Sequence, residues 1–174
     1  ASTIVSNAAA SMGLDFGGAI DNNGTLTVRD STIVGNRADF GGGITSGDLG
    51  NTILAGNSAG TGPDGTGTIV SSDYNLIQNT NGCTITNLTA HNLYNQDPKL
   101  GPLADLGGPT PTHALRFDSP AIDAGNSGGL TTDQRGLPRP IDDPNVANAG
   151  GGDGSDIGDY EADPNLRITR VAKV

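Results

Sequence analysis

One phrase constrains the fold most, because it is written twice: DFGGAI at residues 15–20 and DFGGGI at residues 39–44. Each copy leads to an apolar doublet closed by asparagine, STIVGN at residues 31–36 and NTILAGN at residues 51–57. A fixed period of this kind indicates stacked structural units. The units are too short to hold a βαβ crossover, so each is most simply one coil of a β-solenoid.

Three regions follow one another along the chain. Residues 1–96 carry the repeated phrases and are predicted to form the coils. Residues 97–164 are rich in proline, with seven of the ten prolines between Pro98 and Pro140, and proline removes the donors of a strand ladder. We therefore expect this region to cap the C-terminal end of the stack. Residues 165–174, NLRITRVAKV, form a basic tail predicted to be an outgoing β-strand. Its expected role is that of a linker, of a strand of a following domain, or of a strand that pairs with a neighbouring subunit.

Glycine and asparagine recur at the expected corners of the coils. Glycine adopts the positive φ that tight corners require, and an asparagine amide can bind the same amide one coil away. The predicted corner residues are Gly17, Gly18, Gly41 and Gly42, with a column of Asn7, Asn36, Asn57 and Asn79. The alternative for the asparagines is that they are merely common in turns.

Charge narrows the range of partners. The chain has 19 acidic and nine basic side chains and a net charge of −10. Too few Lys and Arg are present to neutralise a phosphate backbone, so nucleic acid is not an expected partner, and anionic polysaccharide is disfavoured for the same reason. No run of 18 apolar residues occurs, so membrane insertion is not expected.

Several phrases occur in an order that resembles a known family. They are GGGI, NTILAGN, GPD at residues 62–64, YNLI at 74–77, DPKLGPLADLGGPTPTHAL at 97–115, SPAIDAGN at 119–126, TDQRGLPRP at 132–140 and DIGDYE at 156–161. This set resembles the C-terminal part of bacterial right-handed parallel β-helix surface and secreted proteins, the choice-of-anchor Q and polymorphic outer membrane protein-like group. The resemblance implies an all-β, right-handed parallel β-helix in an extracellular or cell-surface protein that is usually non-enzymatic.

The chain departs from the family pattern at two positions. Family members often carry a cysteine directly after GPD, apparently paired with the one that matches Cys83, whereas this chain has Gly65 there. The resemblance thus implies a lost disulfide, and leaves open whether Cys83 is free or forms an intermolecular bond. The phrase DIGDYE also carries an additional carboxylate at Asp159.

Asp15 and Asp39 are candidates for catalytic chemistry because they hold equivalent places in two coils. Carboxylates one strand spacing apart, ~5 Å, suit retaining glycoside hydrolysis, although capping of turns explains the same repetition. A uronate lyase would need recurring bases, and Arg29 and Arg37 do not recur at one coil position.

The histidines and one glycine-rich loop are the remaining candidates for chemistry. His91 and His113 are too few for a catalytic zinc site, and we expect His113 to bind backbone in the cap. Residues 150–159, GGGDGSDIGD, resemble the glycine-aspartate nonapeptide that binds calcium. Asp153 and Asp156 are therefore calcium candidates, with a solvated acidic loop as the alternative; no other cofactor is expected.

Four charged residues anchor the phrases of the cap: Asp123, Asp133, Arg135 and Glu161. We expect a structural role in which Arg135 pairs with carboxylates where segments cross, with an active site as the alternative.

The sequence as a whole favours a non-enzymatic structural protein of the cell exterior: a stalk, adhesin segment or fibre subunit. Self-assembly would use the open first coil and the tail strand, with Arg167, Ile168, Arg170 and Val171 as the contact candidates. The alternatives are a carbohydrate-active enzyme, either a glycoside hydrolase or a polysaccharide lyase, and a glycan-binding module.

Overall fold

A computed structural model of the chain describes residues 1–10, 13–87 and 89–166. This part is nearly all β, with eleven short strands and a 3-10 helix, η1 (Pro164–Leu166). Three residues of helix are far too few to cross a bilayer, and the described residues contain no other helix that could do so.

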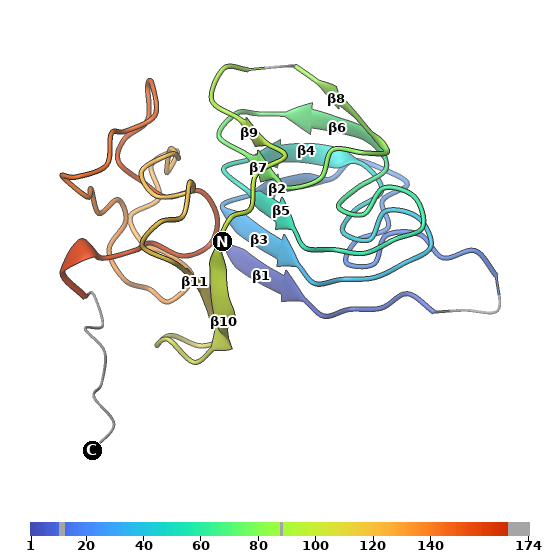
Figure 1. The fold of residues 1–174 in the computed structure, drawn as a ribbon, viewed down its shortest axis with the longest axis horizontal. Coiled ribbons are helices and arrows are strands. Elements are labelled where there is room, and N and C mark those ends of the chain that lie inside the picture. Colours follow the sequence, from blue (N-terminus) through green and yellow to red (C-terminus); the bar gives the residue numbers. More distant parts are fainter. Residues whose placement is uncertain (11–12, 88, 167–174) are drawn as a thin grey trace.

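Nine of the strands form two parallel sheets that face each other (Figure 1). The five-stranded sheet has the order β1 (Ser2–Val5), β3 (Ser31–Val34), β5 (Ile53–Ala55), β7 (Leu76–Ile77) and β9 (Leu93–Tyr94). The four-stranded sheet has the order β2 (Thr27–Arg29), β4 (Gly47–Gly50), β6 (Gly67–Ser71) and β8 (Cys83–Thr86). The chain alternates between the two sheets, so each circuit lies on the one before it. We call each circuit a repeat.

Strand register sorts the side chains into two columns. Ile4, Ile33, Leu54, Ile77 and Tyr94 lie side by side on one face of the five-stranded sheet. Because successive residues of a strand point to opposite faces, Thr3, Thr32, Ile53, Leu76 and Leu93 form a column on the other face. The first column packs against Val28, Leu49 and Ile69 from the second sheet, and this forms the core of the stack.

The two DFGG phrases lie directly on each other. Phe16 bridges Phe40, and Ile20 bridges Ile44, both in parallel. A Cβ added to Gly18 would stand 2.2 Å from the carbonyl oxygen of Gly42, and one added to Gly42 would stand 2.4 Å from that of Pro63. Glycine is therefore required here because the backbones of successive repeats approach too closely for a side chain.

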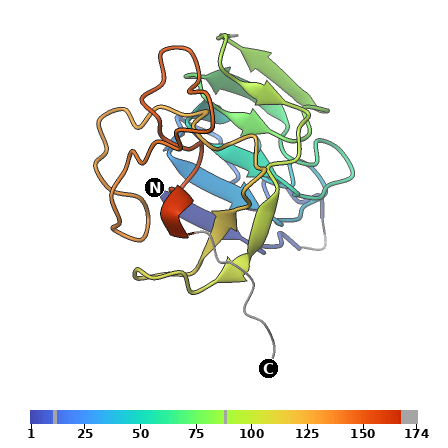
Figure 2. The ribbon, with the colours of Figure 1, turned by 60° about the vertical axis from the view of Figure 1, so that its left-hand side comes forward.

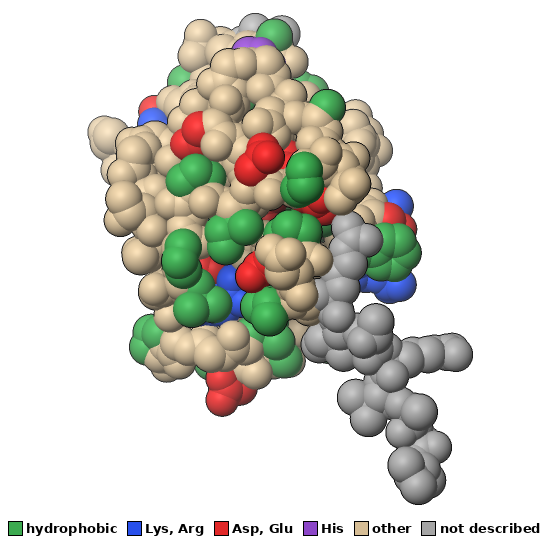
Figure 3. All heavy atoms as spheres, turned by 90° about the vertical axis from the view of Figure 1, so that its left-hand side faces the viewer, with side chains coloured by type: hydrophobic (Ala, Val, Ile, Leu, Met, Phe, Trp, Pro, Cys, Tyr) green, Lys and Arg blue, Asp and Glu red, His purple; other side chains and the backbone are tan. Residues whose placement is uncertain are grey.

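The C-terminal extension lies beside the stack (Figures 1 and 2). It begins with an antiparallel hairpin of β10 (Leu100–Ala104) and β11 (Thr112–Leu115) and continues as irregular chain to η1. Leu115, Ala121, Ile122 and Ile157 of the extension form a second core with Ile53, Ala55 and Leu76. Acidic and apolar side chains are interspersed on the outward side of the extension (Figure 3).

This placement corrects one expectation. The extension was predicted to cap the end of the stack, whereas it covers the outer face of the five-stranded sheet. The physical reason is the column that holds Ile53 and Leu76, which would otherwise expose apolar side chains on that face.

Burial differs between the middle and the ends of the stack. Inner residues of the middle repeats, such as Ile33, Leu54 and Ile69, are fully buried. Their counterparts in the first repeat, Ile4, Ala19, Ile20 and Leu26, are only partly buried, as are Cys83, Ile85 and Tyr94 at the other end. The core of the first repeat is thus partly open in the described part of the chain.

Candidate functional site

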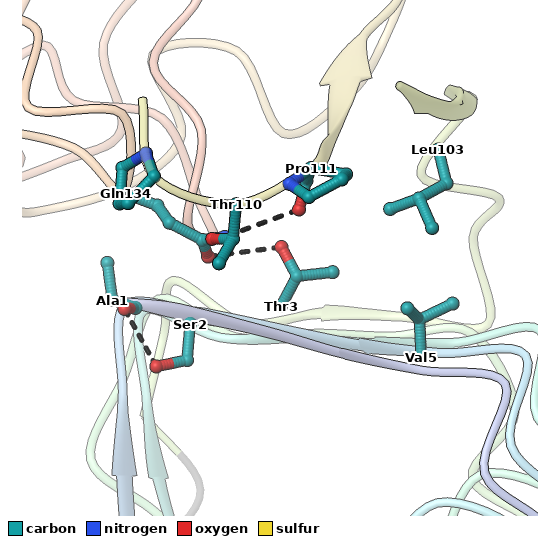
Figure 4. A pocket seen from close by; sticks show the side chains of 9 residues that line it. Ala1, Ser2, Thr3, Val5, Leu103, Thr110, Pro111 and Gln134 are labelled. Atoms are coloured by element: carbon teal, nitrogen blue, oxygen red, sulfur yellow. Dashed lines mark hydrogen bonds between the residues drawn. The ribbon is translucent and has the colours of Figure 1, made fainter. Parts of the chain in front are cut away.

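A groove of about 500 Å³ lies between β1 and the extension (Figure 4). Strand β1 forms its floor, and the chain between β10 and β11 forms the opposite wall. Val5 and Leu103 lie at one end, while Ala1, Thr110 and Gln134 lie toward the other (Figure 4). The lining residues are Ala1, Ser2, Thr3, Val5, Leu103, Pro109, Thr110, Pro111 and Gln134.

The polar side chains of the groove bind one another. Gln134 Nε2 donates to Thr110 Oγ1 at 2.9 Å, and Gln134 Oε1 lies 3.0 Å from Thr3 Oγ1. Ser2 Oγ donates to the carbonyl oxygen of Ala1 at 2.7 Å. None of the lining side chains is ionisable, so this arrangement suits binding of an uncharged surface rather than acid–base chemistry.

Asp159, a residue of the extension, contacts Thr3 in the floor of the groove. Its carboxylate is fully buried and accepts hydrogen bonds from the hydroxyls of Thr3, Thr32 and Thr112, the last at 2.5 Å. A buried carboxylate is tolerated where hydrogen bonds replace its hydration. The additional carboxylate noted in DIGDYE therefore ties β1 and β3 to β11.

The asparagine column is continuous through three repeats. Asn36 Oδ1 accepts from the backbone N–H of Asn7 at 2.9 Å and from its Nδ2 at 3.0 Å, and Asn57 Oδ1 accepts the two equivalent bonds from Asn36 at 2.9 Å each. The next acceptor is Asp64, whose Oδ1 takes both donors of Asn57 and whose Oδ2 takes the backbone N–H of Asn79 at 2.8 Å. Asn79 thus joins the column through its backbone.

Sequence reasoning missed Asp64 as a member of this column. Its carboxylate is buried, which raises the pKa of the Asp64 carboxyl, and the bonds from Asn57 oppose that rise. The signal was the GPD phrase, in which aspartate stands where the column needs an acceptor.

A second amide column was also missed. Asn75 Oδ1 accepts the backbone N–H of Thr52, and Asn92 Oδ1 accepts both donors of Asn75. Asn51 Nδ2 donates to Asp30 Oδ1 at 2.9 Å. The available signal was an asparagine directly before an apolar pair, in YNLI at residues 74–77 and HNLY at residues 91–94.

Asp15 and Asp39 lie in adjacent turns, as their repetition implies. Asp39 Oδ2 accepts the backbone N–H of Asp15 at 3.3 Å, and the carbonyl oxygen of Asp15 accepts the backbone N–H groups of Asp39 and Phe40. Next to them the rings of Phe16 and Phe40 are stacked with centroids 5.0 Å apart, and Phe16 is 46% exposed. The pair of aspartates therefore shapes the turns that present two aromatic rings.

The interior of the extension holds a cluster of buried charges. Arg139 lies with its Nε 3.1 Å from Glu161 Oε2, and both side chains are completely buried. Arg139 also donates from Nη1 to the carbonyl oxygen of Gly158 at 2.8 Å and from Nη2 to that of Asp156. The sequence predicts Arg135 as the cation that pairs with these carboxylates, whereas in the structure Arg139, from the same RGLPRP phrase, lies against Glu161.

The carboxylates of this cluster bind backbone. Asp156 accepts the N–H groups of Asp123 and Ala162, and Glu161 accepts those of Ile141 and Asp156. Asp123 accepts the N–H of Asp143. These residues occupy structural positions in which the carboxylates take the place of ladder acceptors.

Burial sets the protonation of this cluster. It raises the pKa of Asp123 to about 6, and it raises the pKa of Glu161 to about 7 although the Arg139 guanidinium opposes the rise. Burial and then the nearby charge of Glu161 raise the pKa of Asp156 well above its usual range. The folded chain therefore holds protons near neutral pH that a solvated carboxylate would release.

Arg135 and Asp133 form a separate ion pair. Arg135 Nη2 lies 2.6 Å from Asp133 Oδ2 and 2.5 Å from the carbonyl oxygen of Glu161, and its guanidinium lies 3.7 Å from the centre of the Tyr160 ring. Asp133 also accepts the backbone N–H of Glu161. The geometry places Arg135 where chain segments cross.

The calcium candidates are occupied by hydrogen-bond donors. Asp153 accepts from the backbone and hydroxyl groups of Ser127 and Ser155, which lowers the pKa of Asp153. Asp156 binds backbone as described above. Among the described residues no group of three His, Cys, Asp or Glu side chains is arranged for a metal ion.

The basic candidates are dispersed. Arg29 pairs with Asp48 at 3.1 Å on the surface, and Arg37 belongs to the bridges that stack the repeats. His91 Nδ1 lies 2.8 Å from Asp73 Oδ2 and its ring stacks on Tyr74, while His113 Nδ1 lies 2.8 Å from the carbonyl oxygen of Gly101. No two of these four bases contact each other in the described hydrogen bonds.

Cys83 lies against Gly65, the residue that directly follows the GPD phrase. Its thiol donates to the carbonyl oxygen of Gly65 at 3.0 Å, and a Cβ added to Gly65 would stand 3.1 Å from Cys83 Sγ. Burial, and to a lesser extent the charge of Asp64, raises the pKa of the Cys83 thiol to about 11. A protonated, half-buried thiol is a weak nucleophile.

The tail candidates Arg167, Ile168, Arg170 and Val171 lie outside the described residues. Comparison with protein-family models, with curated proteins and with solved structures found no match to this chain.

Proposed function

We propose that the stacked repeats form a right-handed parallel β-helix, and that the chain is a non-enzymatic structural part of an extracellular or cell-surface protein. In this proposal the first repeat is the surface through which it associates with further protein. The observation that carries the proposal is the partly open core of the first repeat.

Burial supports this choice of surface. Ile4 and Ile20 stand in the same columns as Ile33 and Ile44, which are fully buried one repeat later, and β1 is an edge strand of its sheet in the described part of the chain. Soluble proteins usually cover a slice of apolar core and an edge strand, because both promote association. A repeat that resembles its neighbours in register offers a ready surface for more β structure.

The architecture supports a structural role over catalysis. The polar groups that sequence analysis singled out are engaged in backbone hydrogen bonds that hold turns, as with Asp39, or in buried networks, as with Glu161. Each bond of this kind stabilises the stack or its extension, and the groove beside β1 is lined by uncharged side chains.

Sedimentation velocity over a range of concentrations tests the proposal. We expect concentration-dependent association that Ile20→Lys weakens at least tenfold, since the charge would enter the apolar end surface. Val70→Lys, which changes an exposed apolar residue of β6 away from that end, is the matched control and should associate like the parent. Phe16→Ser is a second variant at the same end should Ile20→Lys unfold. Monomers at every concentration would overturn the proposal.

One observation favours glycan binding as a second candidate. The stacked rings of Phe16 and Phe40 are partly exposed beside the carboxylates of Asp15 and Asp39. Aromatic rings can contact the apolar face of a sugar, and carboxylates can accept hydrogen bonds from its hydroxyl groups. A panel of neutral and acidic polysaccharides tests it. Binding that Phe16→Ala abolishes would support a glycan-binding module, whereas turnover abolished by Asp15→Asn or Asp39→Asn would support a carbohydrate-active enzyme.

A further inference from the structure

We propose that Thr3 and Gln134 form an ester bond with each other, in which the side-chain oxygen of Thr3 replaces the amide nitrogen of Gln134 and ammonia is released. The bond would join β1 to the extension. This proposal goes beyond the structural role proposed above and does not depend on association, because all the reacting groups belong to one chain.

The two reacting side chains already lie together in the groove (Figure 4). Thr3 Oγ1 lies 3.0 Å from Gln134 Oε1, although the two residues are 131 positions apart in the sequence. The carboxamide carbon is one C=O bond, about 1.2 Å, from that oxygen, so it also lies close to the hydroxyl. Groups held together in this way react far faster than the same groups free in solution.

Asp159 supplies the base. Its side chain is fully buried behind the groove lining, and its Oδ2 accepts hydrogen bonds from the hydroxyls of Thr3 and Thr112. A threonine hydroxyl has one proton, and a carboxylate is a stronger acceptor than a carboxamide oxygen. The proton of Thr3 therefore lies toward Asp159, and a lone pair of Thr3 Oγ1 faces Gln134. A hydroxyl bound to a base in this way is the arrangement of an activated nucleophile.

The fold also fixes the position of the carboxamide. The backbone N–H of Gln134 donates to the carbonyl oxygen of Asp159 at 2.9 Å, so the residue that carries the electrophile is held beside the one that carries the base. Gln134 Nε2 donates to Thr110 Oγ1 at 2.9 Å in the opposite wall. The leaving nitrogen is thus held toward that wall, and Oε1 stays on the side of Thr3.

Thr3 is assigned as the nucleophile in preference to the two other threonines nearby. Thr110 contacts the carboxamide and Thr112 contacts Asp159, at 2.9 and 2.5 Å, but in the described hydrogen bonds neither contacts both groups. Thr3 contacts both.

The reaction balances without a further reactant. Thr3 Oγ1 attacks Gln134 Cδ while its proton passes to Asp159. The Oγ1–Cδ bond forms, the Cδ–Nε2 bond breaks, and the nitrogen leaves as ammonia with that proton, which restores the carboxylate. An ester is less stable than the amide it replaces, but ammonia becomes protonated in water and diffuses out of the groove. Each molecule reacts once, so a modest rate is sufficient.

Burial protects the product. Asp159 and Thr112 are buried, and Thr3 and Gln134 are only partly exposed, which limits the access of water to the ester. The ester would close a covalent loop that contains the whole stack, so β1 could not separate from the extension without breaking a bond.

Mass spectrometry of the unfolded chain tests the proposal. We expect the parent to be about 17 Da lighter than its sequence mass, which is the loss of one ammonia. After digestion with trypsin at neutral pH, the peptide that ends at Arg29 and contains Thr3 should be joined to the peptide that ends at Arg135 and contains Gln134. Brief treatment with alkali should separate the two peptides.

Variants identify the participating groups. Thr3→Val and Gln134→Glu should have their sequence masses, because the first lacks the nucleophile and the second has no ammonia to lose. Thr3→Ser keeps the hydroxyl and should restore the joined peptides. Asp159→Asn keeps a hydrogen-bond acceptor but not the base, and should lower the rate of joining at least about tenfold. Ser2→Ala, which removes another hydroxyl of the groove, is the control and should behave like the parent.

Three results would overturn the proposal. The first is a parent chain without the loss of ammonia. The second is a loss of ammonia without joined peptides, as happens when an asparagine that precedes glycine, such as Asn23, cyclises. The third is an Asp159→Asn variant that joins as fast as the parent. An unchanged far-UV circular dichroism spectrum, required of every variant, excludes unfolding as the cause of a lost bond.

Discussion

Buried backbone N–H groups are bound by different acceptors in the two regions of the molecule. Where the repeats turn, the acceptor is usually an asparagine side-chain oxygen. Asn36 Oδ1 accepts the backbone N–H of Asn7, and Asn57 Oδ1 accepts that of Asn36. In the extension the acceptor is usually a carboxylate. Asp156 accepts the backbone N–H of Asp123, and Glu161 accepts that of Ile141. The repeats are held by neutral amides and apolar columns, and the extension by buried charge.

The difference follows from regularity. Successive repeats place identical backbone positions next to each other, so strand ladders satisfy most groups and a neutral amide completes each corner. The extension has only one short hairpin in its described residues, and its irregular chain leaves N–H groups that no ladder reaches. Carboxylates satisfy these groups with strong hydrogen bonds, but only if their own charge is compensated in turn.

Loss of the buried cation should break the extension most severely. Arg139→Met leaves Glu161 without its partner, and uncovering a buried charge in this way typically costs about 3–5 kcal/mol. Urea unfolding followed by circular dichroism measures the loss. Arg29→Met removes an exposed ion pair instead and should cost about 1 kcal/mol or less. Equal losses in the two variants would show that the buried ion pair of the extension stabilises the fold no more than an exposed one does.

The amide column offers the corresponding test in the repeats. Asn36→Ala removes the acceptor for Asn7 and the donor to the carbonyl oxygen of Ile4 and to Asn57, so buried groups lose their partners. We expect a loss of about 2–3 kcal/mol in urea unfolding. Asn145→Ala, at an exposed position of the extension, is the control. A loss no greater than that of the control would show that the hydrogen bonds of the asparagine column add nothing measurable to the free energy of unfolding.

Asp159 sharpens the comparison because it joins the two regions. Asp159→Asn keeps the shape but removes the charge that strengthens three hydroxyl hydrogen bonds, and we expect a loss of about 1–2 kcal/mol. Amide hydrogen exchange should rise in β1 and β11 before it rises in β5. Uniform exchange across all three strands would contradict the role of Asp159 as the link. Asp105→Asn, at an exposed acid, is the matched control.

Stability should also depend on pH. The folded-state pKa values of Asp123 and Glu161, about 6 and about 7, lie above those of solvated carboxyls. The folded chain therefore binds more protons than the unfolded chain, so this part of the stability is complete below about pH 4 and is lost as pH rises through the folded values. The urea midpoint should fall between pH 4.5 and pH 8.

Asp123→Asn isolates that effect, since an amide oxygen can still accept the N–H of Asp143 while one titrating group is removed. The fall with pH should become shallower in this variant and should remain unchanged in Asp39→Asn, at an exposed turn. A parent midpoint that rises over this interval would contradict the assignment.

Pattern in the sequence was sufficient where the structure repeats. The period of DFGG and of the apolar doublets indicates parallel stacking because each residue meets its own counterpart one repeat away, as Phe16 meets Phe40. The positions of Gly18 and Gly42 follow from the same logic, and so does the column through Asn36. The sequence pattern did not predict Asp64, because this aspartate accepts the hydrogen bonds that an asparagine accepts in the other repeats.

The rest was decided by contacts between segments far apart in the chain. Nothing local to RGLPRP distinguishes Arg139 from Arg135, and only the packed extension determines which cation is enclosed with Glu161. The position of the extension on the flank of the sheet depends on apolar side chains 40 or more residues away, such as Ile53 beneath Ile157. The groove beside β1 exists because that extension returns to the first strand, where Asp159 meets Thr3. Periodicity predicts contacts between neighbouring repeats, whereas burial free energy over the whole molecule selects the contacts that lie outside the period.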